Sequence, residues 1–275
     1  MQTSDLQGKY INLDRAVARR QSMDLGLARH GLDTIVTRFS ARSGDERPKG
    51  ITPNELGCFL SHQEVITTAD PARPLLVFED DLYFPEKFGK AFAAIVNSVF
   101  DREWDMLFLN KMISFADVRA LYHMLRLKRK AGDIYAPAFN RYSIEPCKGL
   151  YVSGAGAYLI RPAAIPKVAA VLKRAADAGY MRPLDMVYFD AINRDEITAQ
   201  FVFPYLLGIN SSFESTIADR PTEENTLLFN DILNLFVAGG DLDPLRLRAF
   251  GATHDGAFDV DAFIASQILY RRLRR

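Results

Sequence analysis

Three consecutive carboxylates, Glu79, Asp80 and Asp81, are the residues of this 275-residue sequence with the clearest chemical potential. They follow the apolar run PLLVF (74–78), which is typical of a buried parallel strand. Like charges at such a position repel one another, and a divalent cation would relieve that repulsion. Carboxylate oxygens suit Mg²⁺ or Mn²⁺, ions that bridge protein carboxylates to substrate phosphates. We predict that Asp81 ligates such an ion; the alternative is an acidic surface turn.

Strands and helices that alternate along the first half of the chain must position these carboxylates. The sequence predicts strands at 9–13, 33–39, 74–78 and 104–109, and helices at 14–30, 52–69 and 85–100. Asp14 is an expected N-cap, Gly31 an expected helix stop, and Thr52 to Glu55 has the form of a capping box. This alternation favours a parallel sheet with helices on both faces, where ligands bind at the carboxyl ends of the strands.

The second half of the chain is less regular. A glycine-rich turn at 153–160 leads into a strand, and a further strand is expected at 197–203. Helices are predicted at 162–179, from 183 onward, and at 223–237. The segment 111–148, rich in Lys, Arg and Tyr, predicts no clear element.

The composition excludes several classes of protein. A formal net charge of +0 argues against a nucleic-acid partner, and two cysteines form no disulfide framework or zinc pattern. No secretory signal or membrane-spanning run is visible, so we expect a cytoplasmic protein. The C-terminal sequence FIASQILYRRLRR offers a peripheral contact with the inner face of the membrane; the alternative is a solvated basic helix end.

Four segments resemble glycosyltransferase family 25, the lipooligosaccharide galactosyltransferase family that also includes collagen galactosyltransferase domains. They are YINLDRAVARR (10–20), TPNELGCFLSH (52–62), LLVFEDD (75–81), and GAGAYLI (154–160) followed by PLD (183–185). The second and third segments are the most specific. Gly-Ala at 154–155 departs from the family's frequent Gly-Thr, and 111–148 and the region beyond 203 match little.

The resemblance implies an α/β fold of the GT-A type, with a Rossmann-like, mostly parallel mixed sheet flanked by helices. It implies a single catalytic domain, 5–275, with a nucleotide-sugar-binding half (5–110) and an acceptor-side half (148–275). The implied activity is inverting, metal-dependent transfer of a hexose, with galactose favoured, from a UDP-sugar to a glycan or lipid-linked saccharide such as lipopolysaccharide core. Mn²⁺ or Mg²⁺ is the implied cofactor.

The resemblance also assigns donor-binding roles, beginning with Asn12, Arg15 and Arg19 after the first strand. Arginine suits a diphosphate through its paired N–H donors, whereas the plain alternative is a capped helix with solvated arginines. Glu79 or Asp80 would hold the donor ribose or a metal-bound water.

The helix at 52–69 contributes two further candidates. Ser61 and His62 are expected to contact the base or ribose, although a histidine on a half-apolar helix is often a packed structural residue. Cys58 is expected to be a core thiol rather than a nucleophile, because no activating base is identifiable. Glu55 is expected to serve the capping box.

Asp185 is the predicted catalytic residue, as general base for the acceptor hydroxyl. A helix N-cap and a ligand to the transferred sugar are the alternatives for this residue. Asp190 is a second candidate for the base, and His254 is a candidate distant metal ligand that reads equally well as part of a turn.

Two other functions compete with glycosyl transfer. One is a non-catalytic binding module with a glycosyltransferase-like fold, although the intact acidic motif argues against it. The other is a nucleotidyl- or phosphoryl-transferase, which would need a glycine-rich phosphate loop after the first strand. Leu-Asp-Arg stands there instead, at 13–15.

Overall fold

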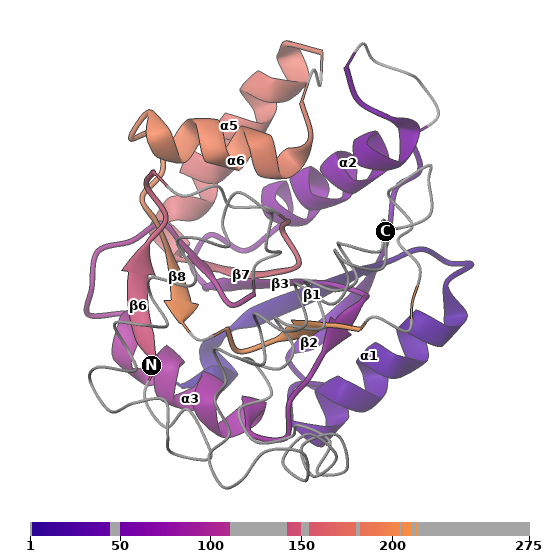
Figure 1. Cartoon of the computed structure of the whole chain (residues 1–275), viewed down its shortest axis with the longest axis vertical. Helices are drawn as coiled ribbons and strands as arrows, with labels where there is room; N and C mark the ends of the chain where they lie inside the picture. The colour runs from indigo at the N-terminus through magenta and orange to yellow at the C-terminus, as the bar shows by residue number, and fades with distance from the viewer. Residues whose placement is uncertain are drawn as a thin grey trace, which may run out of the picture.

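A seven-stranded β-sheet between two layers of helices forms the body of the protein (Figure 1). The computed structural model describes residues 2–44, 50–110, 142–149, 154–179, 182–203, 205–210 and 213. The strands of the sheet are β1 (Gln7–Asn12), β2 (Val36–Ser40), β3 (Leu75–Glu79), β5 (Met106–Phe108), β6 (Ser143–Pro146), β7 (Ala157–Ile160) and β8 (Ala199–Phe203). Two short strands, β4 (Leu82–Tyr83) and β9 (Gly208–Ile209), pair separately and antiparallel.

Five of the seven strands point the same way. The order is β2-β1-β3-β7-β5-β8-β6, in which β1 is parallel to β2 and β3, and β5 is parallel to β8. β7 is antiparallel to both β3 and β5, and β6 is antiparallel to β8. The predicted α/β fold class, a mostly parallel mixed sheet flanked by helices, is confirmed. The carboxyl ends of the five like-directed strands meet at one edge.

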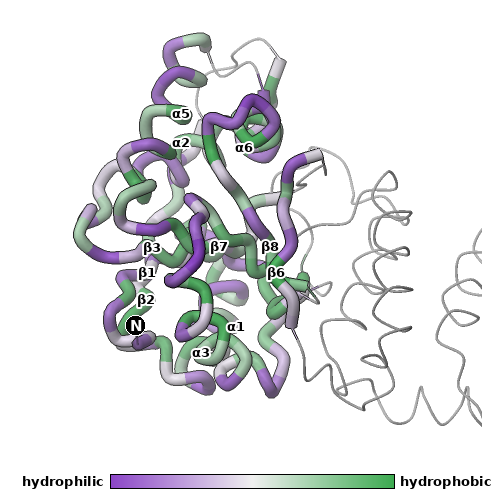
Figure 2. The backbone as a smooth tube through the Cα atoms, turned by 90° about the vertical axis from the view of Figure 1, so that its left-hand side faces the viewer, coloured by the Kyte–Doolittle hydropathy of each residue, from purple (hydrophilic) through white to green (hydrophobic). Residues whose placement is uncertain are grey.

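Helices cover both faces of this sheet, as Figures 1 and 2 show. The helices are α1 (Val17–Arg29), α2 (Pro53–Thr67), α3 (Phe88–Val99), α5 (Ile165–Asp177) and α6 (Leu184–Asn193), with short 3₁₀ turns at Thr3–Asp5 and Pro162–Ala164. α2, α5 and α6 pack on one face, and α1 and α3 pack on the other. The apolar residues of the strands therefore pack into two hydrophobic cores, one on each face of the sheet.

β3 shows how one strand serves both cores. Leu75 and Val77 belong to the core beneath α2, α5 and α6, whereas Leu76 and Phe78 belong to the core beneath α1 and α3. All four side chains are at most 1% exposed. A strand buried on both faces needs an unbroken apolar run rather than alternation, which explains the PLLVF segment.

The start of α2 confirms the predicted capping box. The Thr52 hydroxyl accepts a hydrogen bond from the Glu55 backbone N–H at 3.2 Å, and the Glu55 carboxylate accepts one from the Thr52 N–H at 2.7 Å. Pro53 occupies the first helical turn. These contacts satisfy donors that the first turn of a helix otherwise leaves unpaired.

The start of α1 corrects a prediction. Ala16, not Asp14, is the N-cap residue. The Asp14 carboxylate instead accepts hydrogen bonds from Arg38 and Ser40 on β2. Asp14 therefore pairs with a charged side chain on the neighbouring strand and does not cap α1. The predicted stop of the helix is confirmed, because Gly31 follows the last turn with φ of +69°, a conformation that glycine adopts readily.

Other boundaries shift by a few residues, and some predictions lie outside the described part of the chain. α3 begins at Phe88 rather than at residue 85, and Pro183, not Asp185, is the N-cap position of α6. The predicted helix at 223–237, His254, the basic C-terminal sequence and most of 111–148 fall outside the described residues. Among the helices described, none has the length and apolar character needed to cross a bilayer.

Replacing Thr52 by alanine should lower the free energy of unfolding by about 1 kcal/mol, because the N–H of Glu55 loses its cap. Urea unfolding followed by circular dichroism measures this. Thr52→Ser is the matched control, since it keeps the hydroxyl and should remain close to the wild type. Equal stability of the alanine and serine variants would show that the cap does not stabilise α2.

Candidate functional site

An open cavity lies at the carboxyl ends of β1 and β3. Its volume is about 130 Å³. Seven predicted site residues line it: Arg15, Arg19, Ser61, His62, Glu79, Asp80 and Asp81. Asn12 and Asp185 do not line it, although Asn12 donates a hydrogen bond to Asp80, which does. The structure thus brings together residues from three segments that are far apart in the sequence.

Asp80 is held on both carboxylate oxygens. Asn12 Nδ2 donates to Asp80 Oδ2 at 2.6 Å, and Arg19 Nη1 lies 2.7 Å from Asp80 Oδ1. All three residues are buried. A buried ion pair is tolerated when hydrogen bonds satisfy its remaining polar atoms. Arg38 completes this network by donating from Nε to Asn12 Oδ1 at 2.9 Å. Through these contacts, Asp80 links the end of β3 to β1 and α1.

The carboxylate of Asp81 is less fully paired than that of Asp80. Its Oδ1 is buried and has no hydrogen-bond partner within the part of the chain that the structure describes. Its Oδ2 lies 3.7 Å from Arg19 Nη1. Burial, together with the charge of Glu79, raises the pKa of Asp81 from 3.8 to about 7, and Arg19 only partly opposes this shift. A bare carboxylate with a spare oxygen and a raised pKa is suited to a hard cation.

Two arginines flank these carboxylates. Arg15 is exposed at the cavity, whereas Arg19 is buried against Asp80 and has its guanidinium 5.6 Å from the centre of the Phe213 ring. Guanidinium groups bind diphosphates through paired N–H donors. Arg15 has the exposure that a ligand contact requires, and Arg19 supports the acidic side chains from behind.

The side chains of Ser61 and His62 form hydrogen bonds with other groups of the protein. Ser61 Oγ donates to the Gly57 carbonyl at 2.6 Å and accepts from the Arg42 N–H at 2.8 Å. His62 Nδ1 lies 2.7 Å from the Tyr158 hydroxyl. Both residues are fully buried although they line the cavity wall. Contact with a base or ribose stays a prediction for both.

The loop at 41–44 forms part of the wall, and the sequence reasoning missed it. A Cβ added at Gly57 would lie 2.6 Å from the Arg42 carbonyl oxygen, so only glycine lets α2 approach this loop closely. Arg42 is itself fixed by Glu64, with Nε 2.5 Å from Oε2. The glycine within a helical segment was the available signal for this close approach.

Asp185 and Asp190 occupy different surroundings on α6. Asp185 Oδ2 accepts from the Gly154 N–H at 3.1 Å, and its Oδ1 accepts from the N–H of Met186 at 2.8 Å. Asp190 pairs with Arg182. The general-base role of Asp185 stays a prediction.

Asn110 is a further polar residue that the sequence reasoning missed. It is fully buried directly after β5, at the same edge of the sheet as the acidic residues. Neither polar atom of its side chain has a hydrogen-bond partner among the described residues. A polar residue that directly follows the apolar strand segment WDMLFL (104–109) was the signal in the sequence.

An α/β sheet with an acidic, arginine-lined cavity at the carboxyl ends of its parallel strands is the layout of proteins that bind nucleotides and related phosphorylated ligands. The family model of glycosyltransferase family 25, described as an LPS biosynthesis protein, matches residues 9–188. The chain belongs to this family, which confirms the resemblance found in the motifs. No curated protein matches the chain significantly.

Asp81→Asn should change how stability depends on pH when no divalent cation is present. The pKa of Asp81 is about 7 in the folded state against an ordinary 3.8, so the folded state binds this proton more tightly. The resulting stabilisation is complete below about pH 4 and is lost as the pH rises towards 7. The Asp81→Asn variant should not lose stability in this way. Its free energy of unfolding at neutral pH should therefore exceed that of the wild type.

Urea unfolding in chelator across this pH range measures the difference. Asp33→Asn, which removes an exposed carboxylate, is the control and should follow the wild type. If the free energies of unfolding of the wild type and of Asp81→Asn depend on pH in the same way, the raised pKa of Asp81 is contradicted.

Proposed function

We propose that this protein is a metal-dependent, inverting glycosyltransferase. It transfers a hexose, with galactose favoured, from a UDP-sugar to a glycan acceptor such as lipopolysaccharide core. Membership of glycosyltransferase family 25 supports the transferase class and the link to lipopolysaccharide biosynthesis. The observation that carries the proposal further is the spare, buried oxygen of Asp81 within a cavity that arginines also line.

The residues at this position fit a hard divalent cation. Asp81 offers carboxylate oxygen, the ligand that Mn²⁺ and Mg²⁺ prefer, and its orphaned Oδ1 would gain a partner. Asp80 is already committed to Asn12 and Arg19, so it would orient Asp81 rather than replace it. A bound cation would supply charge stabilisation for a leaving diphosphate.

The cavity wall supports an assignment of donor contacts. Arg15 is placed to bind the diphosphate, because its guanidinium is exposed at the cavity and carries paired donors. Arg19 neutralises Asp80 and so keeps the site from becoming too negative for a phosphorylated ligand. Glu79, whose Oε1 also contacts His62 and Cys58, is the proposed contact for the ribose or a metal-bound water.

Asp185 is the proposed general base. Inversion at the sugar carbon takes one displacement, in which a base removes the proton of the acceptor hydroxyl. The backbone N–H groups of Gly154 and Met186 hold both carboxylate oxygens of Asp185 in a fixed orientation. The acceptor itself is assigned to the later half of the chain, 148–275.

Mn²⁺-dependent release of UDP from one member of a panel of UDP-sugars is the expected activity, first without acceptor and then with lipopolysaccharide core oligosaccharide. Asp81→Ala should abolish it, because the cation loses its protein ligand, whereas Asp33→Ala should not. Calorimetry with UDP and Mn²⁺ tests binding separately. Binding without turnover on any acceptor would favour the non-catalytic binding module, and absence of both would refute the donor site.

Asp185→Asn should lower kcat by about 10²–10⁴-fold, the range for loss of a general base, and leave the affinity for UDP and Mn²⁺ unchanged. Asp190→Asn, which removes the other carboxylate on the same helix, is the matched control and should leave kcat close to that of the wild type. Steady-state kinetics with the best donor and acceptor pair measures both. A larger effect at Asp190 would transfer the role to that residue.

A further inference from the structure

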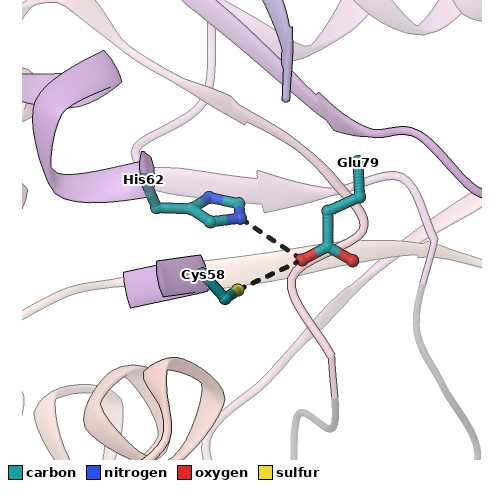
Figure 3. Close-up of side chains that lie close together, drawn as sticks. All are labelled: Cys58, His62 and Glu79. Atoms are coloured by element: carbon teal, nitrogen blue, oxygen red, sulfur yellow. Dashed lines mark hydrogen bonds and ion pairs between the residues drawn. The ribbon is translucent and has the colours of Figure 1, made fainter. Parts of the chain in front are cut away.

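Cys58, His62 and Glu79 point toward one another beside the cavity (Figure 3). Cys58 and His62 lie four residues apart on α2, which places them on one helix face, and Glu79 ends β3. Their potential ligand atoms, one sulfur, one ring nitrogen and one carboxylate oxygen, all lie within 4.8 Å of one another. None of the roles assigned above uses these three atoms together.

Two of the three spacings between these atoms match the edges of a zinc tetrahedron. Zinc bonds of about 2.0–2.1 Å to nitrogen or oxygen and about 2.3 Å to sulfur place ligand N and O about 3.3 Å apart, and S and O about 3.6 Å apart. His62 Nε2 lies 3.3 Å from Glu79 Oε1, and Cys58 Sγ lies 3.7 Å from the same oxygen. These two pairs of atoms would need little movement to bind a metal ion, and the sulfur and the ring nitrogen lie within 4.8 Å of each other.

Tyr158 fixes the histidine ring from the opposite side. Its hydroxyl lies 2.7 Å from His62 Nδ1, and the two rings stack with centroids 5.7 Å apart. A hydroxyl can donate or accept, so Tyr158 can accept the Nδ1 proton and leave the Nε2 lone pair directed at Glu79. A partner of this kind on the second ring nitrogen is the usual support for a metal-binding histidine.

The charges at the cluster favour a cation. Glu79 places a carboxylate oxygen 3.7 Å from the Cys58 sulfur, so a thiolate at this position needs a compensating positive charge. A dication supplies that charge and displaces the thiol proton to solvent. Cys58 is half-buried and lines the cavity, so the cluster is reached from it.

We propose that Cys58, His62 and Glu79 form a Zn²⁺-binding site beside the oxygen-ligand position at Asp81. Thiolate and imidazole select zinc over magnesium and manganese, whereas the carboxylate at Asp81 favours the harder ions. Three protein ligands leave a fourth position for water from the cavity. The site does not depend on the proposed transfer activity, and a metal-binding experiment tests it separately.

Titration of the full-length, metal-free protein with Co²⁺ tests the proposal, because cobalt bound to thiolate gives a charge-transfer band in the near ultraviolet. The wild type should show this band at one equivalent, with the intense visible bands of tetrahedral cobalt, and Zn²⁺ should remove both. Cys58→Ala should lose the band. Cys147→Ala is the matched control and should keep it, since Cys147 is the protein's other cysteine and lies in the core.

Further variants separate this site from others and from misfolding. Asp81→Asn should retain the cobalt band, because Asp81 belongs to the other site. Cys58→Ser, the near-isosteric variant, should keep the native circular dichroism spectrum and still lose the band. Tyr158→Phe should weaken Zn²⁺ binding by about 10–100-fold, as expected when a metal-binding histidine loses its supporting partner.

Several results would overturn the proposal. A folded wild type without a thiolate-to-cobalt band would do so, as would a band that disappears in Cys147→Ala and persists in Cys58→Ala. Loss of the band in Asp81→Asn would show that Asp81 is part of the thiolate site and that three ligands alone do not form it. Failure of UDP-sugar turnover would not affect any of these outcomes.

Discussion

The crowding of three neighbouring carboxylates at the end of β3, one buried and two half-buried, is the constraint on which the rest of the site depends. Charges in a buried environment are stable only when each is paired, hydrogen-bonded or neutralised. The protein meets this requirement differently for each residue. Asp80 is paired with Arg19, Glu79 contacts α2, and Asp81 keeps one oxygen without a hydrogen-bond partner among the residues that the structure describes. A cation bound to this oxygen would therefore stabilise the folded state.

The geometry of an extended strand accounts for this division. Successive side chains of β3 alternate between the two faces of the sheet. Val77 faces the core beneath α2, and Glu79, two residues later, meets the side chains of α2. Phe78 faces the core beneath α1, and Asp80 meets Arg19 of α1. The alternation of the apolar run thus continues into the acidic residues and directs neighbouring charges toward different helices.

The sequence allowed prediction of features that depend on local signals. The capping box at Thr52, the stop at Gly31 and the buried strand before Glu79 each rest on a few adjacent residues, and the structure contains all three. Features that depend on distant partners were not accessible. Asp14 is a good N-cap by type, but Arg38 on the next strand binds it instead. Likewise, no local pattern shows that β7 inserts antiparallel between β3 and β5.

The same limit applies to the cluster beside the cavity. Cys58 is by itself an ordinary core thiol, and His62 is by itself an ordinary packed histidine. Only the docking of α2 against β3 brings them to Glu79, and the missing side chain of Gly57 permits the close approach of α2 to the neighbouring loop. The end of β3 and the facing side of α2 therefore bring sulfur, nitrogen and carboxylate oxygen together, and the carboxylate of Asp81 lines the same cavity. Since metal selectivity follows ligand type, two adjacent positions in one cavity can favour different ions.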